Sequence, residues 1–211
     1  MPVSRGLPKQ SGALRGGDSG FILRLGYNRN SIDIEPALAQ LKASKTPIKA
    51  VVMQATYRAA AKFIEKTHDA YPGLIYTNPS IVGPSTLRDE LMLLGPKYAA
   101  GVVVTLCSPA VDGYSSLVLE YKSALAKYYG ASPDWASLEY YIVGRILVEA
   151  MKRAGPQPDT EKVVEAFESV RDFDIGLGAP ITFGKSEHQG SHRVWGAQLT
   201  ETGKYEPIEL Q

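Results

Sequence analysis

The chain has 211 residues, 44% of them hydrophobic and 21% charged, and a formal net charge of +1. This composition predicts a packed core, and the balanced charge excludes the electrostatic footprint of a protein that binds nucleic acid or a charged membrane surface. The single cysteine, Cys107, excludes an internal disulfide framework and a zinc site built from cysteines.

The first residues carry glycines and scattered charges. Residues 1–19 contain no apolar segment of the kind found in signal peptides, and we expect a disordered leader. No apolar run in the chain approaches the roughly 20 residues of a membrane span.

Strand and helix patterns then alternate four times. The helix at 31–44 has Asp33 as a cap, Pro36 in its first turn, and Ile34, Leu38 and Leu41 on one face. The nearly unbroken apolar run at 49–55 is typical of a strand buried on both faces. We expect strands at 21–25, 49–55, 74–77 and 101–107, and helices at 31–44, 57–71, 85–95 and 115–130.

This alternation predicts an α/β fold with a parallel sheet flanked by helices. After residue 130 the pattern changes. Two helices follow in succession, at 134–155 and 159–170, and then short strands at 179–183 and 193–199 with a turn at 200–205. A chain that leaves a sheet and later returns to it indicates two lobes joined by several crossings.

Candidate ligand contacts follow the predicted strands. In an open parallel sheet, ligands bind beyond the carboxyl ends of the strands. Hydroxyl, amide and aromatic side chains gather there without an acid–base pair, which favours a binding cleft over a catalytic centre. Each of them also has a purely structural alternative, such as packing or a turn. The side chains are Gln54, Thr56, Tyr57, Arg58, Thr77, Asn78, Ser80, Val82, Cys107 and Ser108.

Two histidines, His188 and His192, stand four residues apart. Such a pair shares a metal only on one face of a helix, and Gly190 and the neighbouring turn residues argue against a helix here. We therefore expect no metal site. The histidines are expected to bond the backbone in a bend, with Trp195 packed beneath.

Four stretches in a fixed order carry a family resemblance. They are "YNRNSIDIEPALAQLKA", "AVVMQATYRAAAKFI", "SLEYYIVGRILVEAMKRAG" and "APITFGKSEHQGSHRVW". Together they resemble the type 1 periplasmic solute-binding proteins, and more narrowly the branched-chain amino-acid receptors of ABC transporters, the leucine-binding-protein-like domain. The resemblance implies two flavodoxin-like lobes joined by hinge strands, which close on a small ligand.

The resemblance also implies a division of the chain. Residues 20–130 and 171–211 correspond to most of the second lobe, and residues 131–170 to helices of the first lobe. The strands of the first lobe have no counterpart. The chain therefore looks like the C-terminal portion of such a receptor, truncated and preceded by the leader.

By the same resemblance, Tyr57 matches an aromatic residue that lies on the ligand. Ser80, Ile81 and Val82 match a neighbouring loop, which in some members carries an acidic residue that is absent here. Trp135 to Tyr140 match the cleft-facing start of a first-lobe helix. The predicted ligand-binding set is Tyr57, Arg58, Ser80, Ile81, Val82, Ser108, Trp135 and Tyr140, with no metal and no cofactor.

The resemblance favours a non-enzymatic, periplasmic receptor for amino acids or related aliphatic or aromatic carboxylates, with a membrane permease as partner. Two alternatives stay open: a ligand-sensing regulatory domain of the same fold, and a truncated product that binds nothing.

The helices of 134–170 carry apolar side chains meant for the absent strands, including Ile142, Leu147, Val163 and Phe167. We therefore expect weak or no ligand binding by this chain alone, and self-association through 134–170.

Overall fold

The computed structural model describes residues 22–210. The leader expected at 1–19 lies outside the described residues, as does Phe21 of the first predicted strand. Within residues 22–210 the fold is α/β, with a five-stranded sheet flanked by helices, as the sequence predicts.

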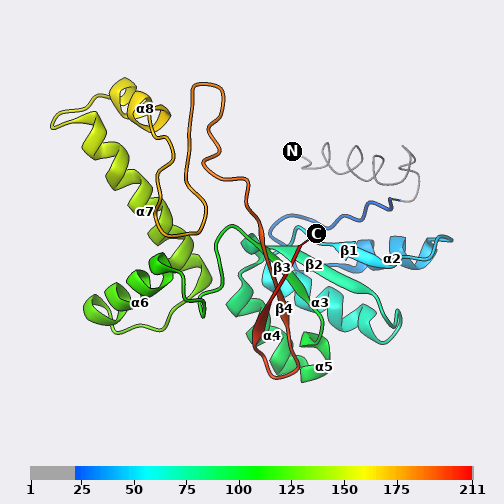
Figure 1. Ribbon diagram of the computed structural model, residues 1–211. Coiled ribbons are helices and arrows are strands. Elements are labelled where there is room, and N and C mark those ends of the chain that lie inside the picture. The colour runs from blue at the N-terminus through cyan, green and yellow to red at the C-terminus, as the bar shows by residue number, and fades with distance from the viewer. Residues whose placement is uncertain (1–21, 211) are drawn as a thin grey trace.

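The sheet is mostly parallel and ends in a hairpin (Figure 1). Its strands lie in chain order and are β1 (Ala50–Val52), β2 (Ile75–Pro79), β3 (Val103–Leu106), β4 (Trp195–Leu199) and β5 (Tyr205–Ile208). β1, β2 and β3 are parallel, because a helix separates each from the next. β4 runs antiparallel to β3. β5 runs antiparallel to β4, because only a short turn at 200–204 joins these two strands.

Three helices and one short 3₁₀ turn connect the parallel strands, and a further helix, α2 (Glu35–Ala43), precedes β1. The connecting elements are α3 (Tyr57–His68), η1 (Ser80–Val82), α4 (Pro84–Leu94) and α5 (Pro96–Ala99). The Thr67 hydroxyl of α3 lies 2.8 Å from the Tyr76 hydroxyl of β2, and the Tyr205 hydroxyl of β5 donates to the Pro84 carbonyl of α4 at 2.9 Å. The face of the sheet that carries Tyr76 and Tyr205 is therefore the one the helices cover.

The hydrophobic core lies between this sheet face and the helices. Alternate strand residues, among them Val104, Leu106, Ala197 and Leu199, are buried there, as are Leu87 and Leu91 of α4. The alternation follows from the two-residue period of a strand, which places every second side chain on the same face. On α2 the predicted face of Ile34, Leu38 and Leu41 is buried, which confirms its orientation.

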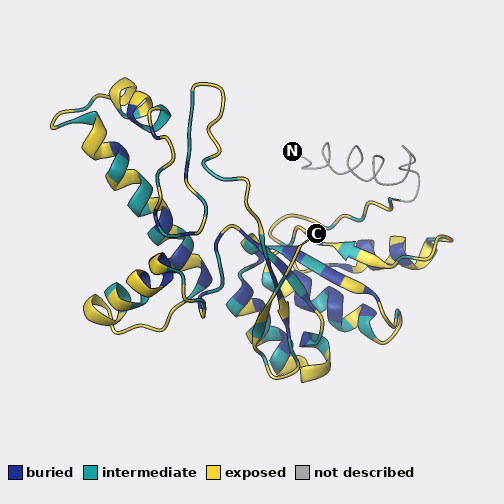
Figure 2. Ribbon diagram, in the orientation of Figure 1, coloured by how far each residue is buried: buried dark blue, intermediate teal, exposed yellow. Residues whose placement is uncertain are grey.

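The opposite face of the sheet is open near β1, and here the sequence prediction is wrong. The apolar run at 49–55 predicted burial on both faces. Val52 is 65% exposed and Ile75 is 52% exposed. β1 is the edge strand of the described sheet, and its first and last residues are exposed (Figure 2).

Three further helices form an arm beside the sheet (Figure 1). They are α6 (Ser116–Tyr128), α7 (Trp135–Ala154) and α8 (Thr160–Glu168), and each begins at a side-chain cap: Ser115, Asp134 and Asp159. A long segment, 171–194, leads from α8 back to β4. We call residues 34–106 and 195–210 the sheet body, and residues 116–194 the arm.

Two predicted strands do not form. Residues 22–25 have no strand structure, because β1 is the edge of the described sheet and no strand pairs with its outer side. Residues 179–183 contribute only an isolated bridge between Ile181 and Phe173. Pro180 has no backbone N–H to donate to a ladder. β5, α5 and η1 have no counterpart among the predicted elements.

The start of α2 differs from the prediction by one residue. Its N-cap is Ile34, and no side chain caps the helix at that position. The Asp33 carboxylate nevertheless accepts the backbone N–H of Glu35 at 3.1 Å, so Asp33 still satisfies a free donor of the first turn.

Candidate functional site

The loops after β2 and β3 meet at the carboxyl end of the sheet. The Ser80 hydroxyl, at the start of η1, lies 3.9 Å from the thiol of Cys107, which directly follows β3. Cys107 is exposed and not the buried small residue that its position in an apolar strand favoured. The parallel arrangement thus brings the predicted loops together, because parallel strands end at a common edge.

Tyr57 and Arg58 begin α3, directly after the loop that follows β1. No side chain caps this helix at Thr56, so the first-turn N–H groups of α3 lack a side-chain acceptor. Tyr57 is half-buried against the core. The Arg58 guanidinium lies 5.6 Å from the centre of the Tyr57 ring and 3.6 Å from a Glu90 carboxylate oxygen on α4.

The loop of η1 turns one side chain outward and the next inward. Ile81 is 72% exposed, whereas Val82 is fully within the core. The backbone then turns at Gly83, whose φ of 77° lies in the left-handed region that favours glycine, and α4 begins at Pro84. A ligand at this loop would therefore meet the Ile81 side chain and the backbone of Val82.

Two buried polar side chains at this end of the sheet have no hydrogen-bond partner within residues 22–210. They are Asn78, near the end of β2, and Ser108, just beyond β3. A buried polar group left unpaired costs about 1–3 kcal/mol. Both groups therefore favour a partner such as a bound water or a ligand atom.

Trp135 and Tyr140 lie on α7 of the arm. Trp135 is buried, and its ring packs edge-on against Tyr205 with 5.8 Å between ring centres. Tyr205 in turn donates to Pro84, so Trp135 is linked to the start of α4 and its preceding loop. Tyr140 is 77% exposed. That these side chains contact a ligand stays a prediction, as it does for the rest of the predicted set.

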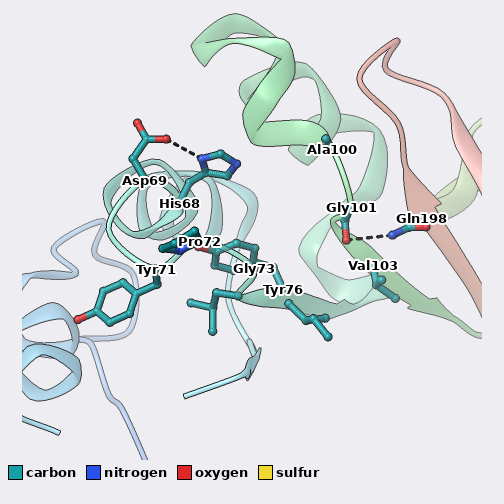
Figure 3. A pocket seen from close by; sticks show the side chains of 12 residues that line it. His68, Asp69, Tyr71, Pro72, Gly73, Tyr76, Ala100, Gly101, Val103 and Gln198 are labelled. Carbon is teal, nitrogen blue, oxygen red and sulfur yellow. Dashed lines mark hydrogen bonds and ion pairs between the residues drawn. The ribbon is translucent and has the colours of Figure 1, made fainter. Parts of the chain in front are cut away.

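A hollow of about 660 Å³ opens at the other end of the strands (Figure 3). It lies where β2 and β3 begin, between the end of α3 and Gln198 of β4. Its charged group, Asp69, already bonds His68 and Lys97 at 2.8 Å and 2.7 Å, and these contacts lower the pKa of Asp69. Ligands of parallel sheets bind at the carboxyl ends, so this hollow is not the predicted cleft.

The two histidines pair with different carboxylates, and the prediction that they bond the backbone is wrong. His188 lies 3.1 Å from Glu168 at the end of α8, and His192 lies 3.3 Å from Glu187. Trp195 does pack against the core, with Arg193 over its ring at 5.1 Å. In residues 22–210, no three His, Cys, Asp or Glu side chains are grouped as metal ligands.

We expect zinc titration to give no stoichiometric response in Trp195 fluorescence, because the exposed histidines have separate partners and no shared ligand geometry. The wild-type chain and His188→Ala should behave alike. A tight, saturable change that disappears in His188→Ala would establish a metal site.

The family follows from comparison with known proteins. The profile of the periplasmic binding protein family matches residues 9–204, and the chain belongs to this family. The family and fold are those of substrate-binding proteins, as the resemblance in the sequence implies. No curated protein sequence matches the chain. In the described part of the chain, no helix is both long and apolar enough to span a membrane.

Solved structures share the fold. A possible leucine/isoleucine/valine-binding protein from Rhodopirellula baltica is 35% identical over 87% of this chain and 48% of its own, with a TM-score of 0.79. A type 1 periplasmic binding protein from Bordetella pertussis is 18% identical over 94% of this chain and 56% of its own, with a TM-score of 0.74.

A branched-chain amino acid ABC transporter protein from Thermus thermophilus with bound valine is 17% identical over 99% of this chain and 57% of its own, with a TM-score of 0.74. The chain thus spans about half the length of these relatives.

Proposed function

We propose that the chain is a solute-binding component of an ABC transporter for amino acids or related small carboxylates. The observation that carries the proposal is the pair of buried, unpartnered side chains, Asn78 and Ser108, at the carboxyl ends of adjacent strands. Beside them lie the half-buried Ser80 and the N-terminus of α3, whose free N–H groups suit a carboxylate.

The same site supports binding without a reaction. Its side chains are hydroxyls, an amide, an aromatic ring, the Cys107 thiol and an arginine that already pairs with Glu90. This set offers no general acid paired with a general base. Membership of the periplasmic binding protein family supports action in the periplasm, with a membrane permease as partner.

The sheet body and the arm would belong to the two lobes that hold the ligand between them. The sequence grouped α6 with the second lobe. In the structure α6 packs on α7, since the Tyr141 hydroxyl donates to Glu120 at 2.9 Å and Arg145 pairs with the same carboxylate. We therefore propose a lobe boundary between β3 and α6 in place of residue 130. The arm would complete a first lobe whose sheet is not among the described residues.

Affinity for a small ligand should be low in this chain. With one lobe the ligand stays half exposed, whereas tight sites bury about 70–90% of a ligand. Each hydrogen bond lost to a charged group removes roughly 1.5–3 kcal/mol, so two or three losses weaken binding by several orders of magnitude.

Nuclear magnetic resonance of the 211-residue chain tests the proposal at millimolar ligand. We expect L-leucine, L-isoleucine or L-valine to shift the amide signals of Tyr57, Ser80 and Ser108, and a diamine without a carboxylate to shift none. Ser80→Ala should weaken the response, and Ser123→Ala, on the exposed side of α6, should not. Shifts confined to other regions, or none at saturating ligand, would contradict a solute site here.

Self-association through the arm is a second part of the proposal. α7 buries Trp135, Leu138 and Ile142 on one side, yet its other side is also apolar and stays exposed. We call this row the α7 stripe; it consists of the exposed Ala136, Tyr140, Val143, Leu147 and Met151 and the half-buried Gly144. The row recurs every three to four residues and contains no charge, as in helices that are covered on both sides.

The occupant we propose for the α7 stripe in the 211-residue chain is a second copy. Gly144 stands at the middle of the stripe, where the lack of a side chain lets another helix approach closely. The row is uncharged throughout, so two identical stripes meet without like-charge repulsion, as the self-complementary interface of a twofold dimer requires.

A further inference from the structure

The junction between the sheet body and the arm is built around one carboxylate. Asp134 is the N-cap of α7, and its Oδ1 accepts the backbone N–H of Ala136 at 2.9 Å. Its Oδ2 accepts the hydroxyl of Ser85, in the first turn of α4, at 2.5 Å. A single side chain of the arm thus joins the N-termini of two helices that are far apart in sequence.

The negative charge of Asp134 is favourable at the N-terminus of α4 and also at the N-terminus of α7. The N-terminus of a helix carries unsatisfied N–H groups and a partial positive charge, which stabilise a nearby anion. α4 has Gly83 as its N-cap and no side-chain cap of its own, so the Asp134 carboxylate supplies the negative charge at that end. The same carboxylate caps α7.

The backbone around Asp134 is held from a third side. The Asp134 N–H donates to the Tyr121 hydroxyl of α6 at 3.0 Å, and the Ser137 hydroxyl donates to the Asp134 carbonyl at 3.0 Å. The next residue, Trp135, packs on Tyr205, which donates to Pro84. Burial raises the pKa of Tyr205, so this donor keeps its proton. α4, α6, α7 and β5 therefore converge on Asp134 and its neighbour.

We propose that Asp134 is the positioning residue that fixes the orientation of the arm relative to the sheet body. The loop Ser80–Val82 runs through Gly83 directly into the turn that carries Ser85. A displacement of this loop would therefore reach Ser85 within five residues and pass to α7 through Asp134. The use of this contact in closure on a solute rests on the proposed function; the orientation of the arm does not.

A rotation of the arm at Asp134 would move the far end of α7 by a measurable distance. Lys152 lies 18 residues beyond Asp134 on the same helix, so its distance along the helix is about 27 Å, and a rotation of about 15° at Asp134 would move it by about 7 Å. Cys107 is exposed, belongs to the loop at the end of β3, and is the single cysteine of the chain.

The experiment is a pulsed electron paramagnetic resonance distance measurement on the full chain without solute. Spin labels are placed on Cys107 and on position 152 in Lys152→Cys. Ser85→Ala removes the contact to α4 and leaves the α7 cap intact, whereas Asp134→Ala removes both. Asp159→Ala is the matched control, because Asp159 caps α8 in the same way through Lys162 N–H at 2.9 Å.

The doubly labelled chain is diluted into an excess of unlabelled chain, so that distances between associated copies do not contribute. Under these conditions we expect a single narrow distance in the parent and in Asp159→Ala. Ser85→Ala and Asp134→Ala should shift or broaden the distribution of distances between the two labels by about 5 Å or more, a change of the size that such a rotation produces at position 152. The thermal unfolding midpoint of each variant is measured beside the distance, because a loss of stability alone would not change the distance in the folded chain. Unchanged distances in Ser85→Ala and Asp134→Ala would overturn the proposal, and so would an equal change in Asp159→Ala.

Discussion

Replacing Leu147 with glutamate is expected to convert the self-associated 211-residue chain into a monomer. Leu147 is 45% exposed near the middle of the α7 stripe. Full burial of an exposed leucine contributes about 1.5–3 kcal/mol, and about half of this is available to the half-exposed Leu147; because a twofold interface contains the residue twice, the association constant should fall at least about 10-fold. The introduced carboxylates would also lose water without gaining a partner.

Sedimentation velocity over a range of concentrations measures this change. The matched control is Leu93→Glu on α4, where Leu93 is 84% exposed and stands apart from the stripe. It adds the same charge, and association should persist. A parent chain that stays monomeric at high concentration would contradict the second-copy occupant. The remaining occupant for the α7 stripe would then be the sheet of a complementary lobe.

Replacing Leu87 with alanine is expected to destabilise the sheet body strongly. Leu87 is fully buried on α4, in the core between the helices and the sheet. Its truncation removes buried methyl groups and leaves a cavity, which costs about 2–5 kcal/mol. Domains of this size are stable by about 5–15 kcal/mol, so a large part of the stability is lost.

Urea denaturation followed by circular dichroism tests this expectation. The midpoint should fall in Leu87→Ala while the slope stays unchanged. Leu93→Ala lies on the same helix but is almost fully exposed, and its effect should stay within about 0.5 kcal/mol. Equal effects of the two substitutions would contradict the placement of α4 against the sheet.

Periodicity alone predicted most of the elements correctly. α3, α4, α6, α7 and α8 each carry an apolar row at helical spacing with a cap or a breaker at the ends. β1 and β3 lie within the predicted apolar runs, and β2 begins in its predicted run and extends two residues beyond it, to Pro79. Local sequence suffices here because the period of the apolar residues reflects the geometry of the element itself.

The failures share a different cause. The sequence of an isolated segment does not indicate whether a neighbouring strand exists. The apolar pattern at 21–25 therefore predicts a strand, although nothing pairs with residues 22–25 in the described sheet. The same reason explains β1. Its apolar run indicates a buried strand, but exposure depends on whether a helix covers each face of the sheet.

At the candidate site, too, the sequence determined some features and the tertiary structure decided others. The sequence determined which polar residues follow the strands, and by resemblance it singled out Tyr57 and the loop Ser80–Val82. Only the tertiary structure decided that Val82 turns into the core while Ile81 stays outside. It also decided that Asn78 and Ser108 are buried without partners in residues 22–210. Such facts depend on contacts between loops distant in sequence.

Asp134 combines both levels. It directly precedes an apolar helical row, a position typical of a cap or turn residue, and in the structure it is the N-cap of α7. Its second oxygen reaches Ser85, 49 residues earlier in the chain. A cap is a local interaction, set by the residue types within one turn, and the sequence by itself determines it. The partner of the other oxygen depends on how α4 and α7 meet in space, and only the packing of the sheet body against the arm decides it.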